Sequence, residues 1–155
     1  MSNYKGHLAG GIFVYLLSIY FVVNSQIISF ATALEWLLFC LLGSLFPDVD
    51  IKSKGQKIFY WIVLILGAIL LFNKRGHALL ILGVLAIFPL LVRHRGTTHR
   101  LWFVIVVPAL VAWLACQYWP GCTSIIFYDT LFFIIGAISH LWLDFGLRRL
   151  LCGKA

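Results

Sequence analysis

Charged side chains are scarce in this sequence, and acidic ones are the scarcest. Only 11% of the 155 residues are charged and five are acidic, whereas 63% are apolar. Soluble domains carry about 25% charged residues, and a small domain exposes a large surface for its volume. Twelve basic and five acidic side chains cannot cover that surface. The composition therefore excludes a water-soluble globule and indicates a bundle embedded in a membrane.

The cysteines are too few and too scattered to define a site. All four lie in or beside apolar runs without C-x-x-C spacing, so they neither specify a metal knuckle nor suggest a disulfide framework. They are Cys40, Cys116, Cys122 and Cys152. Only Lys5 precedes the first apolar run and no small-x-small pattern follows it, so we expect a retained helix there instead of a cleaved signal peptide.

Long apolar runs make up most of what is present, and polar or Gly/Pro clusters divide them into six segments. The segments are 8–23, 28–46, 58–72, 77–92, 101–119 and 125–147. A helix needs about 20 residues to cross a bilayer, so 155 residues leave no room for a soluble domain. The sequence predicts an all-α integral membrane bundle of six transmembrane helices, with 1–155 as a single domain.

Basic residues are unevenly divided between the two sides that six spans define. The side of both termini receives ten Lys and Arg, and the other side receives only Lys74 and Arg75. The ten are Lys5, Lys52, Lys54, Lys57, Arg93, Arg95, Arg100, Arg148, Arg149 and Lys154. Because Lys and Arg concentrate on the cytoplasmic side, both termini are predicted there. The basic residues form short clusters between spans, so anionic lipid is the expected partner and nucleic acid is not.

Most side chains that can carry chemistry fall on that same predicted side. Ionisable groups at membrane depth are costly unless they are paired or bound to metal. Seven of the ten His and acidic residues gather there, namely His7, Asp48, Asp50, His94, His99, His140 and Asp144. Imidazole and carboxylate are the ligands that zinc and related ions prefer. The sequence therefore predicts a divalent-metal site, with zinc as the expected ion and one or two ions bound.

Two of the motifs place candidate ligands in pairs. His140 and Asp144 are spaced i, i+4 and stack on one face of a helix, either as metal ligands or as a hydrogen-bonded pair that closes the helix packing. Asp48 and Asp50 flank Val49 and face the same way in an extended stretch. Without other ligands nearby, these two aspartates would be interpreted as part of a solvated turn. The histidines predicted on the same side favour a metal site instead.

A third motif, H-R-G-T-T-H over 94–99, contains two more histidines. Gly96 allows a tight turn and Thr97 or Thr98 can cap the fifth helix, which would put His99 in its first turn. The other interpretation is an interfacial basic turn. Near the N-terminus, His7 precedes Gly10 and Gly11, whose size permits close approach of another helix.

The remaining ionisable residues lie too far along the chain to join this site. Asp129 is about 16 Å before His140 on a helix, and Glu35 is about 20 Å before Asp48. His77 follows the basic residues of the opposite side and is interpreted as interfacial.

Together these motifs resemble a known family. The order of an N-terminal His, L-F-P-D-V-D, H-R-G-T-T-H and G-A-I-S-H-L-W-L-D is similar to the YdjM-like membrane-bound metal-dependent hydrolases of bacterial and archaeal inner membranes. The resemblance covers nearly the whole chain and implies site roles for the same seven residues. Arg100 stands where the family usually has a small Ser. A more distant similarity, to zinc-dependent phospholipase C and P1-type nucleases, favours phosphoester chemistry.

From these features we predict a membrane hydrolase in which the metal activates water against a phosphoester of an anionic lipid. One of the two aspartates ligates metal and the other acts as general base, and we assign these roles to Asp48 and Asp50 respectively. Arg95 is expected to grip phosphate in the transition state. The residues expected to bind the lipid head group are Lys52, Lys54, Arg93 and Arg100. The ligands assigned to metal are His7, Asp48, His94, His99, His140 and Asp144.

Two functions of other classes stay open. A transporter for a divalent metal, or one coupled to protons, needs polar residues at the bilayer midplane, where the spans offer only Glu35 and His140. A structural protein with a metal-stapled face would bind the ion without turnover. The sequence indicates no oligomeric state.

Overall fold

The structure is a computed structural model that describes residues 3–23, 27–49, 54–91 and 98–151. These residues form six α-helices and two short 3-10 turns, and no strand occurs among them. The helices are α1 (Tyr4–Val23), α2 (Phe30–Leu45), α3 (Lys54–Phe72), α4 (Gly76–Leu91), α5 (Leu101–Tyr118) and α6 (Thr123–Leu151). The turns are η1 (Phe46–Asp48), directly after α2, and η2 (Pro120–Cys122), directly before α6. The predicted all-α bundle is confirmed.

Five of the described helices are long and apolar enough to cross a membrane. The remaining helix, α4, is apolar over its described residues Gly76–Ile87. The third helix begins at Lys54 and thus extends through Lys57, as expected from the short apolar run. The bundle is therefore an integral membrane protein with five candidate spans and a sixth apolar helix.

The two central helices, α2 and α6, cross with their backbones in direct contact. Two glycines make this approach feasible, because a Cβ atom added at Gly43 would lie 1.9 Å from the carbonyl oxygen of Phe133. A Cβ at Gly136 would lie 2.0 Å from the carbonyl oxygen of Cys40. No larger residue fits at either position without separating the helices. The crossing sets the register between α2, which leads into η1, and the half of α6 that holds His140.

The N-terminal helix packs on this pair through a single face. His7, Gly11 and Tyr15, spaced four residues apart, are its buried residues. A Cβ at Gly11 would lie 2.9 Å from the Ser44 side chain, so the predicted close approach of another helix is confirmed. Much of the remaining apolar surface of α1, such as Phe13 at 63% exposure, faces outward, as expected in lipid.

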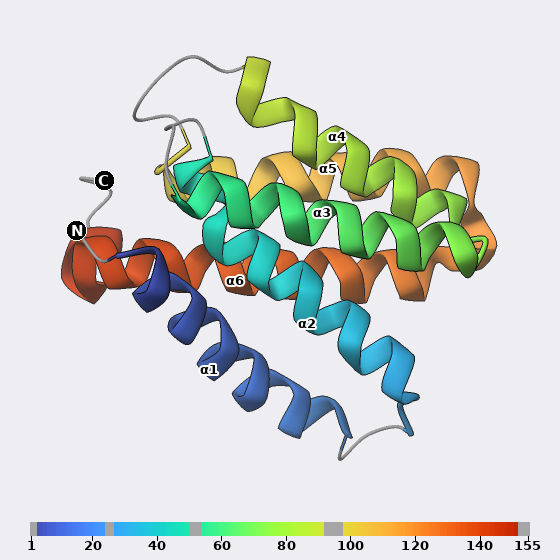
Figure 1. Cartoon of the computed structure of the whole chain (residues 1–155), viewed down its shortest axis with the longest axis horizontal. Coiled ribbons are helices and arrows are strands. Elements are labelled where there is room, and N and C mark those ends of the chain that lie inside the picture. The colour runs from blue at the N-terminus through green and yellow to red at the C-terminus, as the bar shows by residue number, and fades with distance from the viewer. Residues whose placement is uncertain (1–2, 24–26, 50–53, 92–97, 152–155) are drawn as a thin grey trace.

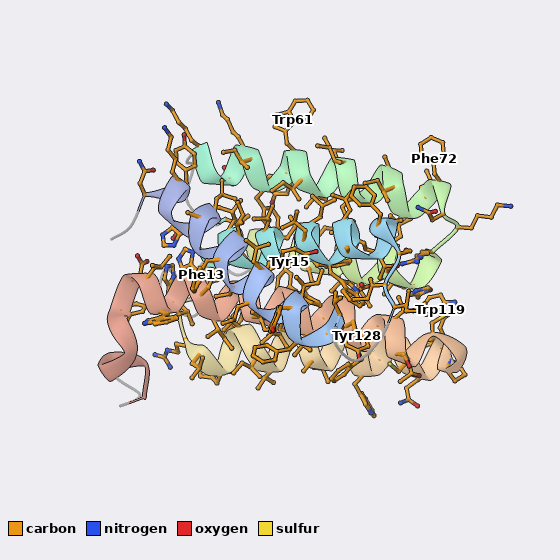
Figure 2. The ribbon with its side chains drawn as sticks, turned by 90° about the horizontal axis from the view of Figure 1, so that it is seen from below. Phe13, Tyr15, Trp61, Phe72, Trp119 and Tyr128 are labelled. Atoms are coloured by element: carbon orange, nitrogen blue, oxygen red, sulfur yellow. The ribbon has the colours of Figure 1, made fainter. Side chains whose placement is uncertain are left out.

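Different segments of the chain lie at the two ends of the bundle (Figure 1). The start of α1, the end of α2 with η1, the start of α3 and the last part of α6 lie at one end. The end of α1, the start of α2, and the α3–α4 and α5–α6 connections lie at the other end. Large aromatic side chains such as Trp61 and Phe72 point away from the bundle, as lipid-facing residues do (Figure 2).

Candidate metal centre

Five ligand-type side chains from four separate segments converge at the end that holds the start of α1. They form two groups, His7 with His140 and Asp144, and Asp48 with His99 and His140. Within each group one ligand atom of every residue lies within 4.8 Å of the others. His140 belongs to both groups. The structure therefore brings together five of the seven residues that the sequence assigns to the site.

The contacts of the second group surround one oxygen of Asp48. Its Oδ1 atom lies 3.2 Å from Nε2 of His99 and 3.7 Å from Nε2 of His140. Nε2 of His140 also lies 3.5 Å from Oδ2 of Asp144, one helical turn further along α6. At 3.5 to 3.7 Å these His140 contacts are too long for hydrogen bonds. A His140–Asp144 hydrogen bond that merely closes the helix packing is therefore not what the structure contains.

His7 completes the cluster from α1. Its Nε2 atom lies 3.7 Å from Oδ1 of Asp144 and 4.0 Å from Oδ2 of Asp48. Its ring stacks on that of His140, with centroids 3.7 Å apart and planes at 13°. Neither ring nitrogen of His7 has a hydrogen-bond partner among the described residues. A buried imidazole without such a partner calls for a bound group.

The orientation of His140 is fixed by α2. Its Nδ1 lies 2.8 Å from the carbonyl oxygen of Ser44, which can only accept, so Nδ1 carries the proton and donates. In the neutral ring Nε2 then presents a lone pair toward the carboxylates of Asp48 and Asp144. Lone pairs that face one another without a proton between them repel, and a bound cation removes that repulsion. A backbone carbonyl that holds the far nitrogen of a histidine is the usual support of a metal-ligating ring.

The spacing of the donor atoms fits a metal ion. A tetrahedral zinc ion binds nitrogen and oxygen ligands at about 2.0–2.1 Å, which places those ligands roughly 3.3 Å from one another. The nitrogen–oxygen distances here run from 3.2 to 4.0 Å. Small side-chain movements suffice to close the longer ones. The residues present therefore fit a divalent ion of the zinc class. Because Nδ1 of His140 donates to Ser44, only its Nε2 can bind metal, so the two groups describe one ion with supporting groups, and a second ion would need other ligands.

The cluster is closed on one side and open on the other. The side chains of His7, His140 and Asp144 are 1%, 0% and 4% exposed, whereas those of His99 and Asp48 are 16% and 26% exposed. Access is therefore from the side of η1 and of the residues just before α5. Structural metal sites are fully closed by protein ligands, whereas catalytic sites keep an open position.

The remaining predicted site residues are not placed with these five. Lys54 is the exposed first residue of α3, and Arg100 is the exposed N-cap of α5. The others, Asp50, Lys52, Arg93, His94 and Arg95, lie outside the described residues.

One local expectation is wrong. The N-cap of α5 is Arg100 without a side-chain cap, so Thr98 does not cap the helix and His99 precedes it. The Nε2 atom of His99 lies against Asp48 instead. His77 lies at the start of α4, away from the site, where it is buried at 6% exposure and packs on Trp119, with ring centroids 6.4 Å apart.

Sequence reasoning missed the Ser44 carbonyl, which holds His140 in place. Every residue has a backbone carbonyl, so no side-chain pattern signals this role. The only hint is the small residues of α2 around Gly43, which mark a close helix crossing.

A comparison of the sequence with protein-family models identifies the family of the chain. The model described as "YdjM inner membrane protein" matches residues 1–148. The chain belongs to the YdjM inner membrane protein family. With five candidate spans, the family indicates a multi-pass protein of the inner membrane. Searches of curated proteins and of solved structures gave no match, so the distant similarity to zinc-dependent phospholipase C and P1-type nucleases has no support.

Proposed function

We propose that this YdjM-family protein is a membrane-embedded metal-dependent hydrolase that cleaves a phosphoester of an anionic membrane lipid. The observation that carries the proposal is the convergence of imidazole and carboxylate ligand atoms, above all Nε2 of His140 against the carboxylates of Asp48 and Asp144. A divalent ion at such a site lowers the pKa of water and neutralises charge on a phosphoryl group.

The side chains of the site would bind the ion, accept a proton and bind the phosphate. His7, His140 and Asp144 form the buried wall, whereas Asp48 and His99 face the open side from which a head group enters. Asp50 follows Asp48 by two residues, and its carboxylate would take a proton from the attacking water. Arg95 and its basic neighbours would bind the phosphate, since a guanidinium matches two phosphate oxygens at once.

Two observations favour a hydrolase over the alternatives. A metal ion that only holds helices together is enclosed by protein ligands and needs no access from outside. Asp48 is 26% exposed, so this site is open on one side. Transporter sites lie near the midplane. In the described part of the chain, by contrast, His140 contacts Ser44 in the last turn of α2, and Glu35 lies near the start of that helix.

The direct test is elemental analysis of the purified protein together with turnover of a panel of lipid phosphates in mixed micelles. We expect a divalent ion at one or two equivalents and turnover that a chelator abolishes and zinc restores. Bound metal without turnover of any lipid phosphate would contradict the hydrolase proposal and favour the staple.

Replacement of Arg95 separates phosphate binding from metal binding. If Arg95 grips phosphate, Arg95→Ala should keep its bound metal but lose about 2 kcal/mol or more of transition-state stabilisation, roughly 30-fold in rate. Arg95→Lys should recover only part of the rate, because an ammonium lacks the planar fork. Metal content and turnover are compared in the same preparations. If Arg95→Ala retains both its metal and its turnover, Arg95 takes no part in the reaction.

We further propose that the site faces the cytoplasm, because the basic residues are concentrated at its end of the bundle. Single cysteines at the exposed residues Lys54 and Asn73, at the two ends of α3, form a matched pair. In intact cells an impermeant thiol reagent should label Asn73→Cys above the signal of the parent protein and leave Lys54→Cys unlabelled. Labelling of Lys54→Cys from outside would place the site, and its substrate, on the other face.

A further inference from the structure

A second group of ionisable side chains is buried at the end of the bundle opposite the metal centre. Glu35 of α2 is 3% exposed and Asp129 of α6 is 0% exposed. Arg75 lies between α3 and α4 and reaches in from that end of the bundle. Each acid lies about two helical turns from the start of its helix, within the apolar span. Acids at such a depth call for a functional explanation.

The contacts within this group are unequal. The Arg75 guanidinium donates to Oε2 of Glu35 and forms an ion pair with it. The other oxygen of Glu35 and both oxygens of Asp129 lack a well-formed hydrogen bond among the described residues. The Asp129 carboxyl lies beside the Trp36 indole and close enough to Glu35 and Arg75 for their charges to act on it. Among the described residues, the Trp36 indole is thus the donor beside Asp129, and the guanidinium pairs with Glu35 instead.

The charges of the group do not balance if both acids are ionised. Two carboxylates then face one guanidinium, which Glu35 already engages. The other titratable groups nearby offer no compensation: the Tyr15 hydroxyl of α1 donates to the carbonyl of Ala33, and the His77 ring of α4 packs on Trp119. An uncompensated carboxylate buried in a membrane protein is strongly unfavourable. One positive charge must therefore be bound.

An open cavity lies next to this group. It has a volume of about 280 Å³ and is lined by Arg75, Trp36 and Tyr128, together with Ser29 and Thr32 at the start of α2 and Ser124 at the start of α6. Two of its lining residues, Arg75 and Trp36, are the ones that contact the acids. Tyr128 lies in the same half of the bundle as Trp119 (Figure 2). The acids themselves do not line the cavity, so water in it reaches them only past Arg75 or Trp36.

We propose that Asp129 is a proton-binding site: it holds one proton at neutral pH as a neutral carboxylic acid and exchanges it with water through this cavity. The proton supplies the missing positive charge and removes the uncompensated carboxylate. A proton needs no coordination shell, whereas a sodium ion needs about six oxygen donors, by analogy with other hard cations. This site is independent of the metal centre and of the hydrolase proposal.

Infrared spectroscopy tests the proposal, because a protonated carboxylic acid has a carbonyl stretch that a carboxylate lacks. Full-length protein in lipid is measured at neutral pH, where an aspartate in water is ionised. We expect a carboxylic-acid band that shifts when the aspartate side chains are labelled with ¹³C and is lost in Asp129→Asn. The labelling experiment uses the unmodified sequence, so it decides the question even if the variant does not fold.

Two further variants sharpen the result. Glu35→Gln frees Arg75 to balance Asp129, which should then ionise, so the band should be lost there too. Asp144→Asn, the same replacement at the other end of α6, should keep the band. Absence of the band in the unmodified protein, a shift with labelled glutamate instead of aspartate, or persistence in Glu35→Gln would overturn the proposal. A band that appears only when sodium is removed would also overturn it, since sodium would then be the occupant.

Discussion

His140→Ala is expected to remove the bound divalent metal from the purified protein and with it all turnover. His140 is the residue that both ligand groups share, and its Nε2 lone pair faces the carboxylates of Asp48 and Asp144. A four-ligand zinc site is worth about 10–16 kcal/mol, so each ligand contributes about 3–4 kcal/mol, or at least a hundredfold in affinity. Elemental analysis after size-exclusion chromatography gives the metal content.

The matched control is His77→Ala. His77 is also a buried histidine in a helix, but it packs on Trp119 at the opposite end of the bundle. Its replacement removes the same atoms without touching a ligand, so metal content should stay at the level of the unmodified protein. His99→Ala is the intermediate case: His99 belongs to only one group, so its loss should weaken metal binding less than the loss of His140 does. Equal metal in all three variants would refute the site.

The helices could be predicted from the sequence because a membrane makes the local pattern decisive. Within lipid every backbone polar group must be satisfied inside its own segment, so a long apolar run forms a helix whatever its neighbours are. The fifth run, predicted over 101–119, forms Leu101–Tyr118. The third begins four residues earlier than its apolar run, because α3 continues through the polar residues at its start. The fourth run, predicted over 77–92, is helical over Gly76–Leu91.

The membership of the site was predictable for a related reason. Alternation of the spans puts His7, Asp48, His99, His140 and Asp144 at one end of the bundle, and the structure brings all five together. Their mutual geometry was not predictable. The stacking of His7 on His140 depends on how α1 packs against α6, and no local pattern encodes that register.

The buried acids at the other end show where the sequence interpretation was too narrow. From the sequence, Glu35 and Asp129 were compared with the predicted metal site only by their distances along their helices. Both acids are indeed far from that site. They are near each other because α2 and α6 cross, which is a tertiary fact. The basic residue that joins them, Arg75, was counted only as a loop charge, yet it pairs with Glu35 inside the bundle.

The crossing that positions both sites leads to the second large effect, which is expected in Gly136→Ala. A methyl group there would lie 2.0 Å from the Cys40 carbonyl oxygen and 3.0 Å from the backbone nitrogen of Ser44. These are backbone atoms, so the clash cannot be relieved by a rotamer change and α2 must move away from α6. Ala is otherwise the better helix former by about 1 kcal/mol, whereas overpacking costs about 1–3 kcal/mol and more when backbone is displaced.

Gly136→Ala should therefore lower both thermal stability and metal content, because the Ser44 carbonyl that orients His140 moves with α2. Gly83→Ala is the control: it makes the same replacement inside α4, where a Cβ meets nothing within 4 Å. Its melting temperature should be unchanged or slightly higher, and its metal content should equal that of the unmodified protein. Both variants are compared by thermal unfolding in detergent and by elemental analysis of the same samples. If Gly136→Ala matched Gly83→Ala in both measurements, the close α2–α6 crossing, and the support it gives to the metal centre, would be refuted.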